Sequence, residues 1–338
     1  MVRPRGRLRV LRQLVRVLDR PVPWGRRRGP PLCVRLPRKT SLRSARGRCA
    51  LVWRALRATL EEMFKLAWRV PNFAMMRGTA PAKAVTPQKP VVQETPVKFR
   101  SGKHTVIVKE VFDIAPKFPQ TYLIRFTFEN EPVFDFEPGQ FISIFAEKDG
   151  KRISRPYSIA SWPENKDYLE LCIKIVEGGF MSNYLYHVSP GTKLQSIGPL
   201  GRFVIPEPIR YDTVFVATGT GVAPFIAMMG HIWEQGLDDG RDFTVIFGVR
   251  YVHDLIYRDL MEKWEREHPN FHFYPTISRP ETPDWKGRVG YVQKVIQNEI
   301  TDYGNKQVFI CGLHDMVEDV KNLCQRLGFA YVRFEKWD

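Results

Sequence analysis

The sequence predicts two folded domains: a six-stranded antiparallel β-barrel over residues 99–208, then a doubly wound parallel α/β domain over residues 209–338. Three observations support this fold class. Short runs of alternating apolar and polar residues, separated by Pro, Asp, Asn and Gly, fill the first segment and are typical of antiparallel strands. A continuous apolar run opens the second segment, and strands then alternate with helices. The chain length of 338 residues suits two domains.

Charge is distributed unevenly along the chain, whose formal net charge is +16. Residues 1–77 hold 21 Lys and Arg against three acidic residues, whereas the remaining 261 residues hold 31 against 33. The predicted domains are therefore close to neutral. A nucleic-acid-binding surface is not expected on them.

The basic segment 1–77 has three interpretations. The first is an Arg-rich, acid-poor targeting peptide. The second is a disordered basic tail before an amphipathic helix at residues 51–70 that contacts a membrane surface. The third is sequence that lies upstream of the true start. In the third case the protein begins at Met63, Met75 or Met76, and we favour this interpretation because the composition changes abruptly. Residues 78–98 are rich in Pro and Thr and are expected to form an extended linker.

The cysteines argue against several kinds of site. Five are present, widely spaced and without a Cys-x-x-Cys pair: Cys33, Cys49, Cys172, Cys311 and Cys324. This pattern disfavours a disulfide framework, a zinc site and an iron–sulfur cluster within the chain, and no metal site is predicted. A reducing compartment, the cytoplasm, is the simplest expectation. No run of about 18 apolar residues is present, so no membrane-spanning helix is predicted.

Six strands and one helix are expected in the first domain. The strands are expected at His104–Val111, Tyr122–Phe128, Gln140–Phe145, Arg155–Ser161, Tyr168–Val176 and Thr192–Ile197. The helix begins near Gly178–Ser182, where free backbone N–H groups attract phosphate, although an ordinary capped helix has the same pattern. Residues Gly198–Phe203 are expected to form a tight turn that closes the barrel.

The stretch Arg155-Pro156-Tyr157-Ser158 is the most informative part of this domain. On a strand, Arg155 and Tyr157 share one face and Ser158 points to the other. Pro156 donates no backbone N–H, which suits an edge strand. A guanidinium suits a phosphate, a phenol can cover an aromatic ring, and a hydroxyl can donate to a ring nitrogen, so the stretch suggests a flavin site. Taken alone, it fits an ordinary edge strand better.

The second domain is expected to alternate strands with helices. Strands are predicted at Thr213–Ala217, Thr244–Phe247, Phe271–Ile277, Gln307–Cys311 and Tyr331–Phe334. Helices are predicted at Phe225–Trp233, Leu255–Arg266, Val292–Ile300 and Met316–Leu327. This alternation is the pattern of a doubly wound sheet, whose ligands bind at the carboxyl ends of the strands.

Two glycine motifs follow strands of this domain. In Thr218-Gly219-Thr220-Gly221, the glycines would let the backbone approach a pyrophosphate, and Pro224 fits the first turn of the next helix. Cys311-Gly312 lies at the end of another strand. Both motifs are therefore candidates for nucleotide binding, although Cys311 taken alone is better explained as a small buried thiol.

Together these motifs resemble the ferredoxin–NADP⁺ reductase superfamily. Four of them occur in the family's order: Arg155–Ser158, Gly179–Ser182, Gly219–Pro224 and Cys311-Gly312. The resemblance covers about residues 99–338, which is everything except the basic segment and the linker. It implies an FAD-binding barrel over 99–208 followed by an NAD(P)-binding domain over 209–338.

For the barrel, the resemblance implies a flavin site. Arg155 would hold a flavin phosphate, Tyr157 would pack on the isoalloxazine, and Ser158 would donate to flavin N5. Gly179 and Ser182 would bind the pyrophosphate. The site would be completed by Pro156, Phe180, Met181, Cys172, Ile173 and Lys174.

For the α/β domain, the resemblance implies a nicotinamide site. Residues Thr218–Gly221 and Pro224 would cradle the nucleotide, with Thr220 near the flavin ring, and Cys311 and Gly312 would lie beside nicotinamide C4. At the C-terminus, Glu335 and Trp337 keep the spacing of a glutamate and a terminal aromatic in plant-type members. Here Asp338 extends the chain and Trp replaces Tyr. The implied catalytic residues are Ser158, Cys311 and Glu335, and Trp337 would cover the flavin.

Coenzyme choice is predicted from charge. Ser278-Arg279 and Arg288 resemble the arrangement of NADP-dependent members, and Arg250 follows another strand. Cations at these strand ends suit a 2′-phosphate, whereas an acid would suit a free ribose hydroxyl. NADPH is therefore expected in preference to NADH, although solvated loop arginines give the same pattern. FAD rather than FMN follows from the resemblance alone.

The expected function is hydride transfer between NADPH and FAD N5, followed by electron transfer to a separate carrier, a ferredoxin or flavodoxin. Reduced flavin can release electrons singly, and the chain has no ferredoxin-type cysteine run. One alternative is the reductase component of an oxygenase or multisubunit oxidoreductase. Another, from a different class, is a non-catalytic anchoring or binding protein whose basic segment contacts membrane or nucleic acid.

Overall fold

A computed structural model of the chain describes residues 98–281 and 284–337. The predictions for the basic segment 1–77, including membrane-surface contact at 51–70, and for linker residues 78–97 lie outside the described residues. Within the described ranges, no helix combines the length and apolar character needed to traverse a lipid bilayer.

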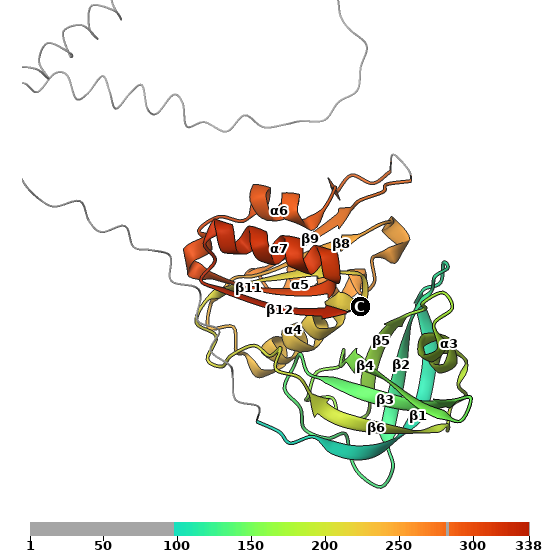
Figure 1. Cartoon of the computed structure of the whole chain (residues 1–338). Coiled ribbons are helices and arrows are strands. Elements are labelled where there is room, and N and C mark those ends of the chain that lie inside the picture. The colour runs from blue at the N-terminus through green and yellow to red at the C-terminus, as the bar shows by residue number, and fades with distance from the viewer. Residues whose placement is uncertain (1–97, 282–283, 338) are drawn as a thin grey trace, which may run out of the picture. The chain divides into compact units, whose positions relative to one another are not determined.

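The first domain is a six-stranded antiparallel sheet curved into a half-barrel (Figure 1). Its strands are β1 (Gly102–Ala115), β2 (Thr121–Phe128), β3 (Phe141–Lys148), β4 (Lys151–Ser158), β5 (Leu169–Lys174) and β6 (Lys193–Leu200), and its helix is α3 (Phe180–His187). The strand order is β4-β3-β6-β1-β2-β5. The two outer strands approach each other at an isolated bridge between Ile159 and Leu171.

The alternating sequence pattern produces the barrel core. In β3, Ile142, Ile144 and Ala146 are buried and the residues between them are partly exposed. Side chains two apart share one face of a strand, so each strand contributes one apolar row to the interior. Tyr122, Ile124 and other buried residues of β1, β2 and β5 join the same cluster.

The structure corrects three barrel predictions. β1 extends to Ala115, with register shifts between Val108 and Glu110 and between Asp113 and Ala115. These irregularities interrupt the alternation on which the prediction relied. β4 begins at Lys151, because the charged tip of the β3–β4 hairpin pairs although it shows no apolar alternation. Residues 198–200 belong to β6, so the predicted turn 198–203 is wrong in its first half.

The second domain is a six-stranded parallel sheet in the order β10-β9-β8-β7-β11-β12. Its strands are β7 (Asp212–Thr218), β8 (Phe243–Val249), β9 (Phe271–Ile277), β10 (Arg288–Val289), β11 (Lys306–Leu313) and β12 (Tyr331–Trp337). The α-helices are α4 (Ala223–Gln235), α5 (Arg258–Glu267), α6 (Val292–Glu299) and α7 (His314–Leu327). Short 3₁₀ turns lie at η1 (Gly219–Val222), η2 (Val252–Asp254) and η3 (Tyr303–Asn305).

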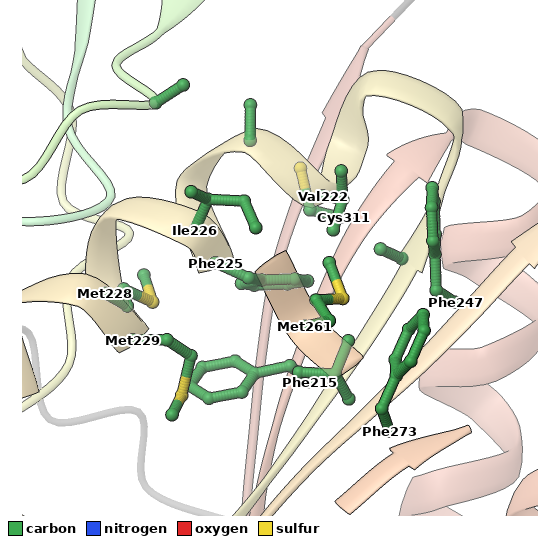
Figure 2. Close-up of a cluster of buried hydrophobic side chains, with 14 of the residues drawn as sticks. Phe215, Val222, Phe225, Ile226, Met228, Met229, Phe247, Met261, Phe273 and Cys311 are labelled. Carbon is green, nitrogen blue, oxygen red and sulfur yellow. The ribbon is translucent and has the colours of Figure 1, made fainter. Parts of the chain in front are cut away.

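Helices cover both faces of this sheet (Figure 1). Phe215 and Ala217 of β7 pack in one cluster with α4 and α5. Val214 and Val216 pack in the opposite cluster with α6 and α7. Because successive side chains of a strand point to opposite faces, the continuous apolar run of β7 supplies both layers. Figure 2 shows part of the first cluster, including Phe215.

The structure also corrects two predictions in this domain. The predicted helix Leu255–Arg266 begins only at Arg258, after η2, because Tyr257 has a left-handed backbone with φ of 55°. The two-residue strand β10 was not predicted, since so short a segment carries no periodic signal.

The order of the second sheet has one topological switch point. From β7 the chain moves outward through β8 to β9 and β10, and it then returns to the other side of β7 to form β11 and β12. In open α/β sheets, ligands bind outside the carboxyl ends of the strands at such a point. The switch point lies between β7 and β11, where Thr218 ends β7 and Cys311-Gly312 directly precede Leu313, the last residue of β11.

Candidate active site

The tetrapeptide Arg155–Ser158 forms the end of β4, an outer strand of the half-barrel. Arg155 and Pro156 are exposed, and the Arg155 Nη1 donates to the carbonyl oxygen of Ser154 at 2.8 Å. Tyr157 packs against the barrel core, and burial raises the pKa of its phenol although the Arg155 charge opposes the shift. The Ser158 hydroxyl is buried and has no hydrogen-bond partner within the described residues.

The start of α3 is tied down by local hydrogen bonds. The Ser182 Oγ accepts from the backbone N–H of Val176 at 3.0 Å, and Asn183 Nδ2 donates to the carbonyl of Gly179 at 2.6 Å. The Ser182 proton remains able to donate. Lys148, which the sequence did not single out, places its ammonium 5.5 Å from the ring centre of Phe180. A cation at the first residue of a helix adds to the attraction for phosphate there.

The run Cys172-Ile173-Lys174 on β5 divides between two environments. Ile173 packs inside the barrel, whereas Cys172 belongs to the cluster that also includes residues of α4 and α5. Lys174 Nζ lies 3.3 Å from the Asp254 carboxylate of the α/β domain. Their predicted contacts with flavin stay predictions, as do those of Phe180 and Met181.

The two glycine motifs of the α/β domain pack directly against each other. A Cβ on Gly221 would lie 2.4 Å from the carbonyl oxygen of Cys311. Gly312 has φ of +151°, and a Cβ there would lie 2.3 Å from Thr218 Oγ1. A side chain at Gly221 would therefore force η1 away from β11, and one at Gly312 would collide with the last residue of β7. Thr218 Oγ1 is buried and has no hydrogen-bond partner within the described residues.

Cys311 lies in a mostly apolar setting beside the end of β12. It is fully buried, and Figure 2 shows it in one cluster with Val222 and Phe225. Trp337 Nε1 donates to its sulfur at 3.2 Å. Burial, and secondarily the Glu335 charge, raises the thiol pKa. Cys311 is therefore a neutral thiol at physiological pH, so its environment does not favour a thiolate nucleophile.

Glu335 pairs in register with Cys311 in the neighbouring strand. Burial raises the pKa of its carboxyl to about 7. Its Oε2 is buried without a hydrogen-bond partner among the described residues. This is a carboxyl poised between its charged and neutral forms near neutral pH.

Phe141 connects the tetrapeptide to the carboxyl end of the parallel sheet. It pairs with Ser158 between β3 and β4. Its ring meets the Trp337 ring edge-on, with the centroids 6.2 Å apart and an interplanar angle of 88°. Since Trp337 donates to Cys311, two contacts lead from the partner strand of Ser158 to the Cys311 thiol. The barrel motif and the C-terminal motif therefore lie close together.

Three candidate residues carry buried polar atoms without partners among the described residues: Ser158 Oγ, Thr218 Oγ1 and Glu335 Oε2. Leaving a buried polar group unpaired costs about 1–3 kcal/mol. A flavin and a nicotinamide offer ring nitrogens, carbonyl oxygens and an amide that could satisfy such atoms. The residues present therefore fit both cofactors.

The predicted arginines differ in what they already contact. The loops after β8 and β9 are joined, since the Arg279 backbone N–H donates to the Arg250 carbonyl at 2.9 Å, and both residues are exposed. Ser278 Oγ donates to the Val249 carbonyl at 3.3 Å. Arg288, by contrast, bonds to Glu299 at 2.9 Å and stacks on a tyrosine ring.

The sequence matches the oxidoreductase FAD-binding domain family over residues 117–205 and the oxidoreductase NAD-binding domain family over residues 215–322. It is 33% identical over 234 residues to ferredoxin–NADP reductase B of Sorangium cellulosum, which covers 67% of this chain and 95% of that protein. It is 30% identical over 200 residues to the toluate 1,2-dioxygenase electron transfer component of Pseudomonas putida, covering 59% of this chain and 57% of that protein.

Among solved structures, an Amycolatopsis cytochrome P450 reductase is similar, with 26% identity and a TM-score of 0.63 over 70% of each chain. The fold and these matches define a two-domain flavin and nicotinamide nucleotide oxidoreductase. The chain belongs to the ferredoxin–NADP⁺ reductase-like superfamily and is an NAD(P)H-dependent flavin oxidoreductase. This membership argues against the alternative of a non-catalytic binding protein.

Sequence reasoning missed several residues at this site. Phe141 was assigned only to an apolar strand, and Lys148 to no element, because contacts with distant residues leave no periodic trace. Asp254 and Tyr257 were likewise not singled out. The position of Lys148 at a hairpin end beside the start of α3 could have been anticipated only by pairing β3 with β4 first.

Proposed function

We propose that this flavoenzyme transfers a hydride between NADPH and FAD N5 and passes electrons to a separate ferredoxin or flavodoxin. The proposal is supported chiefly by the contact between Phe141 and Trp337, which joins β3, the neighbour of the tetrapeptide strand β4, to the Cys311 end of the sheet. FAD supplies the chemistry when bound, since it takes up a hydride at N5 and releases electrons one at a time.

In this proposal, the barrel residues bind and orient FAD. Arg155 pairs with a phosphate, for which an exposed guanidinium is suited. The Tyr157 ring packs on the isoalloxazine, and Gly179 and Ser182 hold the pyrophosphate at the α3 N-terminus. Ser158 donates its hydrogen to N5, which satisfies an otherwise unpaired buried hydroxyl.

The residues at the carboxyl end of the parallel sheet orient the nicotinamide. Thr218 and the η1 turn receive the nucleotide at the switch point. Nicotinamide C4 reaches the neutral Cys311 thiol, which is buried in this structure, once Trp337, which donates to its sulfur, moves aside. Glu335, whose pKa is raised to about 7 by burial, donates a hydrogen bond in its protonated form.

Arg250, Ser278 and Arg279 are proposed to select NADPH over NADH. Their strand ends are joined by backbone hydrogen bonds, and both arginine side chains are exposed. A 2′-phosphate would be favoured by two such cations. Arg288 is given a smaller role because its guanidinium already pairs with Glu299.

The electron acceptor is tested directly by assay. The purified, FAD-loaded chain should reduce a ferredoxin or flavodoxin with NADPH as the donor. Reduction of cytochrome c, which accepts the electrons from the carrier, is the readout. Without the carrier, cytochrome c reduction should stay at background level. Rapid cytochrome c reduction without any carrier would contradict the need for one. Failure with both carriers, together with reduction of an added oxygenase component, would favour the second candidate.

That second candidate is the reductase component of an oxygenase or multisubunit oxidoreductase. It is favoured by the similarity to the toluate 1,2-dioxygenase electron transfer component of Pseudomonas putida. A pull-down from cell extract that recovers an oxygenase subunit instead of a carrier would select it. The cytoplasmic location stays a prediction.

A further inference from the structure

One face of β5 contacts the α/β domain through three residues. Glu170, Cys172 and Lys174 are two positions apart, so their side chains share a face of the strand. Tyr257 Oη donates to Glu170 Oε1 at 3.3 Å, and Lys174 Nζ lies 3.3 Å from Asp254 Oδ1. All of these partners lie in the segment between β8 and the body of α5.

The barrel end of this contact is rigidly held. Arg125 Nε donates to Glu170 Oε2 at 2.7 Å, and its Nη1 donates to Glu110 at 2.9 Å. The guanidinium also stacks on the Tyr168 ring at 4.2 Å. Glu170 is only 6% exposed. A charge-assisted network of this kind on three adjacent strands fixes the carboxylate that Tyr257 contacts.

On the α/β-domain side of this contact, Tyr257 has an unusual backbone conformation. Tyr257 has φ of 55°, in the left-handed region, and immediately precedes α5. A residue with a Cβ pays about 1–2 kcal/mol for this conformation, and it persists where surrounding contacts demand it. No glycine stands at this position, which indicates that the tyrosine side chain itself is used. Desolvation is the main reason the pKa of Tyr257 is raised, so its hydroxyl stays protonated and donates.

The same segment leads back to a proposed nucleotide-binding position. Arg250 directly follows β8, and its carbonyl accepts a hydrogen bond from the Arg279 N–H after β9. The chain then continues through η2, which carries Asp254, to Tyr257. The segment that follows the proposed nucleotide-binding end of β8 is therefore also the segment that contacts β5.

We propose that Tyr257, supported by the Lys174–Asp254 pair, is a positioning residue that sets the α/β domain on the barrel for hydride transfer. In this proposal Tyr257 acts through Glu170 and not through a contact with either cofactor. This inference rests on the proposed function, because it assigns the contact a role in aligning nicotinamide with flavin. A displacement of about 1 Å at the reacting atoms can cost on the order of a hundredfold in rate.

Replacement of Tyr257 by Phe tests the proposal in the full FAD-loaded chain. At saturating NADPH, we expect the stopped-flow rate constant for flavin bleaching to fall about tenfold or more, since alignment is impaired. The NADPH dissociation constant should stay within about twofold, because no nucleotide contact is removed. Long-wavelength charge-transfer absorbance, which reports stacking of nicotinamide on flavin, should weaken in parallel.

Tyr303→Phe is the matched control, because Tyr303 lies in η3 ahead of β11, away from the carboxyl ends of the strands. It should leave the rate unchanged. Lys174→Gln and Asp254→Asn should each slow bleaching to a smaller degree. In a Glu170→Gln background, Tyr257→Phe should cause little further loss, since the two side chains act as one unit.

A Tyr257→Phe variant that keeps the bleaching rate and the charge-transfer band would overturn the proposal, even if its melting temperature falls. If Tyr257→Phe does not fold, normal bleaching in both Lys174→Gln and Asp254→Asn would overturn it instead. These outcomes differ from failure of the proposed function, in which the unsubstituted protein itself is not bleached by NADPH.

Discussion

Glu335→Gln should remove a pH-dependent component of stability. The glutamate carboxyl is buried beside Cys311 at the end of β12, and its Oε2 has no hydrogen-bond partner among the described residues. Glutamine has nearly the same size but does not titrate. The substitution therefore isolates the ionisation of one group without opening a cavity.

The direction and magnitude of this change in stability follow from the pKa of Glu335. Burial raises it from its ordinary value of 4.5 to about 7, so between these values the folded chain keeps a proton that the unfolded chain has lost. The stabilisation is complete below pH 4.5 and is lost as the pH rises through about 7. At 1.36 kcal/mol per pKa unit, a rise from 4.5 to about 7 corresponds to a total loss of about 3 kcal/mol in the free energy of unfolding.

Urea unfolding between pH 5 and pH 8 measures this effect. The difference in unfolding free energy between wild type and Glu335→Gln should change by about 2–3 kcal/mol in favour of the glutamine variant as the pH rises. Glu234→Gln, at an exposed position on α4, is the control and should show no such trend. A difference that stays constant with pH would refute the account of Glu335 as a desolvated carboxyl.

Three further predictions concern the site. Gly221→Ala should destabilise the fold by about 1–3 kcal/mol, because its Cβ would lie 2.4 Å from the Cys311 carbonyl oxygen. Thermal unfolding measures the loss, with Gly304→Ala as the control because nothing lies within 4 Å of a Cβ there. Equal destabilisation by the two substitutions would contradict the prediction. Ser158→Ala should slow flavin bleaching about tenfold with FAD affinity nearly unchanged, and Ser158→Thr should partly restore the rate; loss of FAD alone would assign Ser158 to binding. Replacing Arg250 and Arg279 by Gln should raise the KM for NADPH far more than the KM for NADH. Arg288→Gln should raise the KM for NADPH by a smaller factor. Equal increases in KM for both coenzymes would refute the proposal that these arginines select NADPH.

The sequence predicted the strands and helices whose apolar residues recur in a regular pattern. Alternation located the interior row of β3, with Ile142 and Ile144, and the apolar run located β7 between two helical layers. The tip of the β3–β4 hairpin and the strand β10 escaped prediction. The first is charged and the second has two residues, so neither carries an apolar pattern.

The candidate site could be predicted only in part for a similar reason. Glycine motifs and the tetrapeptide are local in sequence, so the residues at the strand ends could be named. The contact of Phe141 with Trp337 and that of Glu170 with Tyr257 join residues far apart in the chain. The raised pKa of Glu335 comes from burial by distant elements, which a sequence pattern does not contain.

The central claim, that nicotinamide and flavin meet where Phe141, the partner of Ser158, contacts Trp337 beside Cys311, is tested most directly by anaerobic stopped-flow spectroscopy. The FAD-loaded protein is mixed with NADPH carrying either hydrogen or deuterium at both C4 positions. We predict that NADPH bleaches the flavin in a single turnover and that deuterium slows the bleaching. Flavin that stays oxidised with both NADPH and NADH would contradict the account.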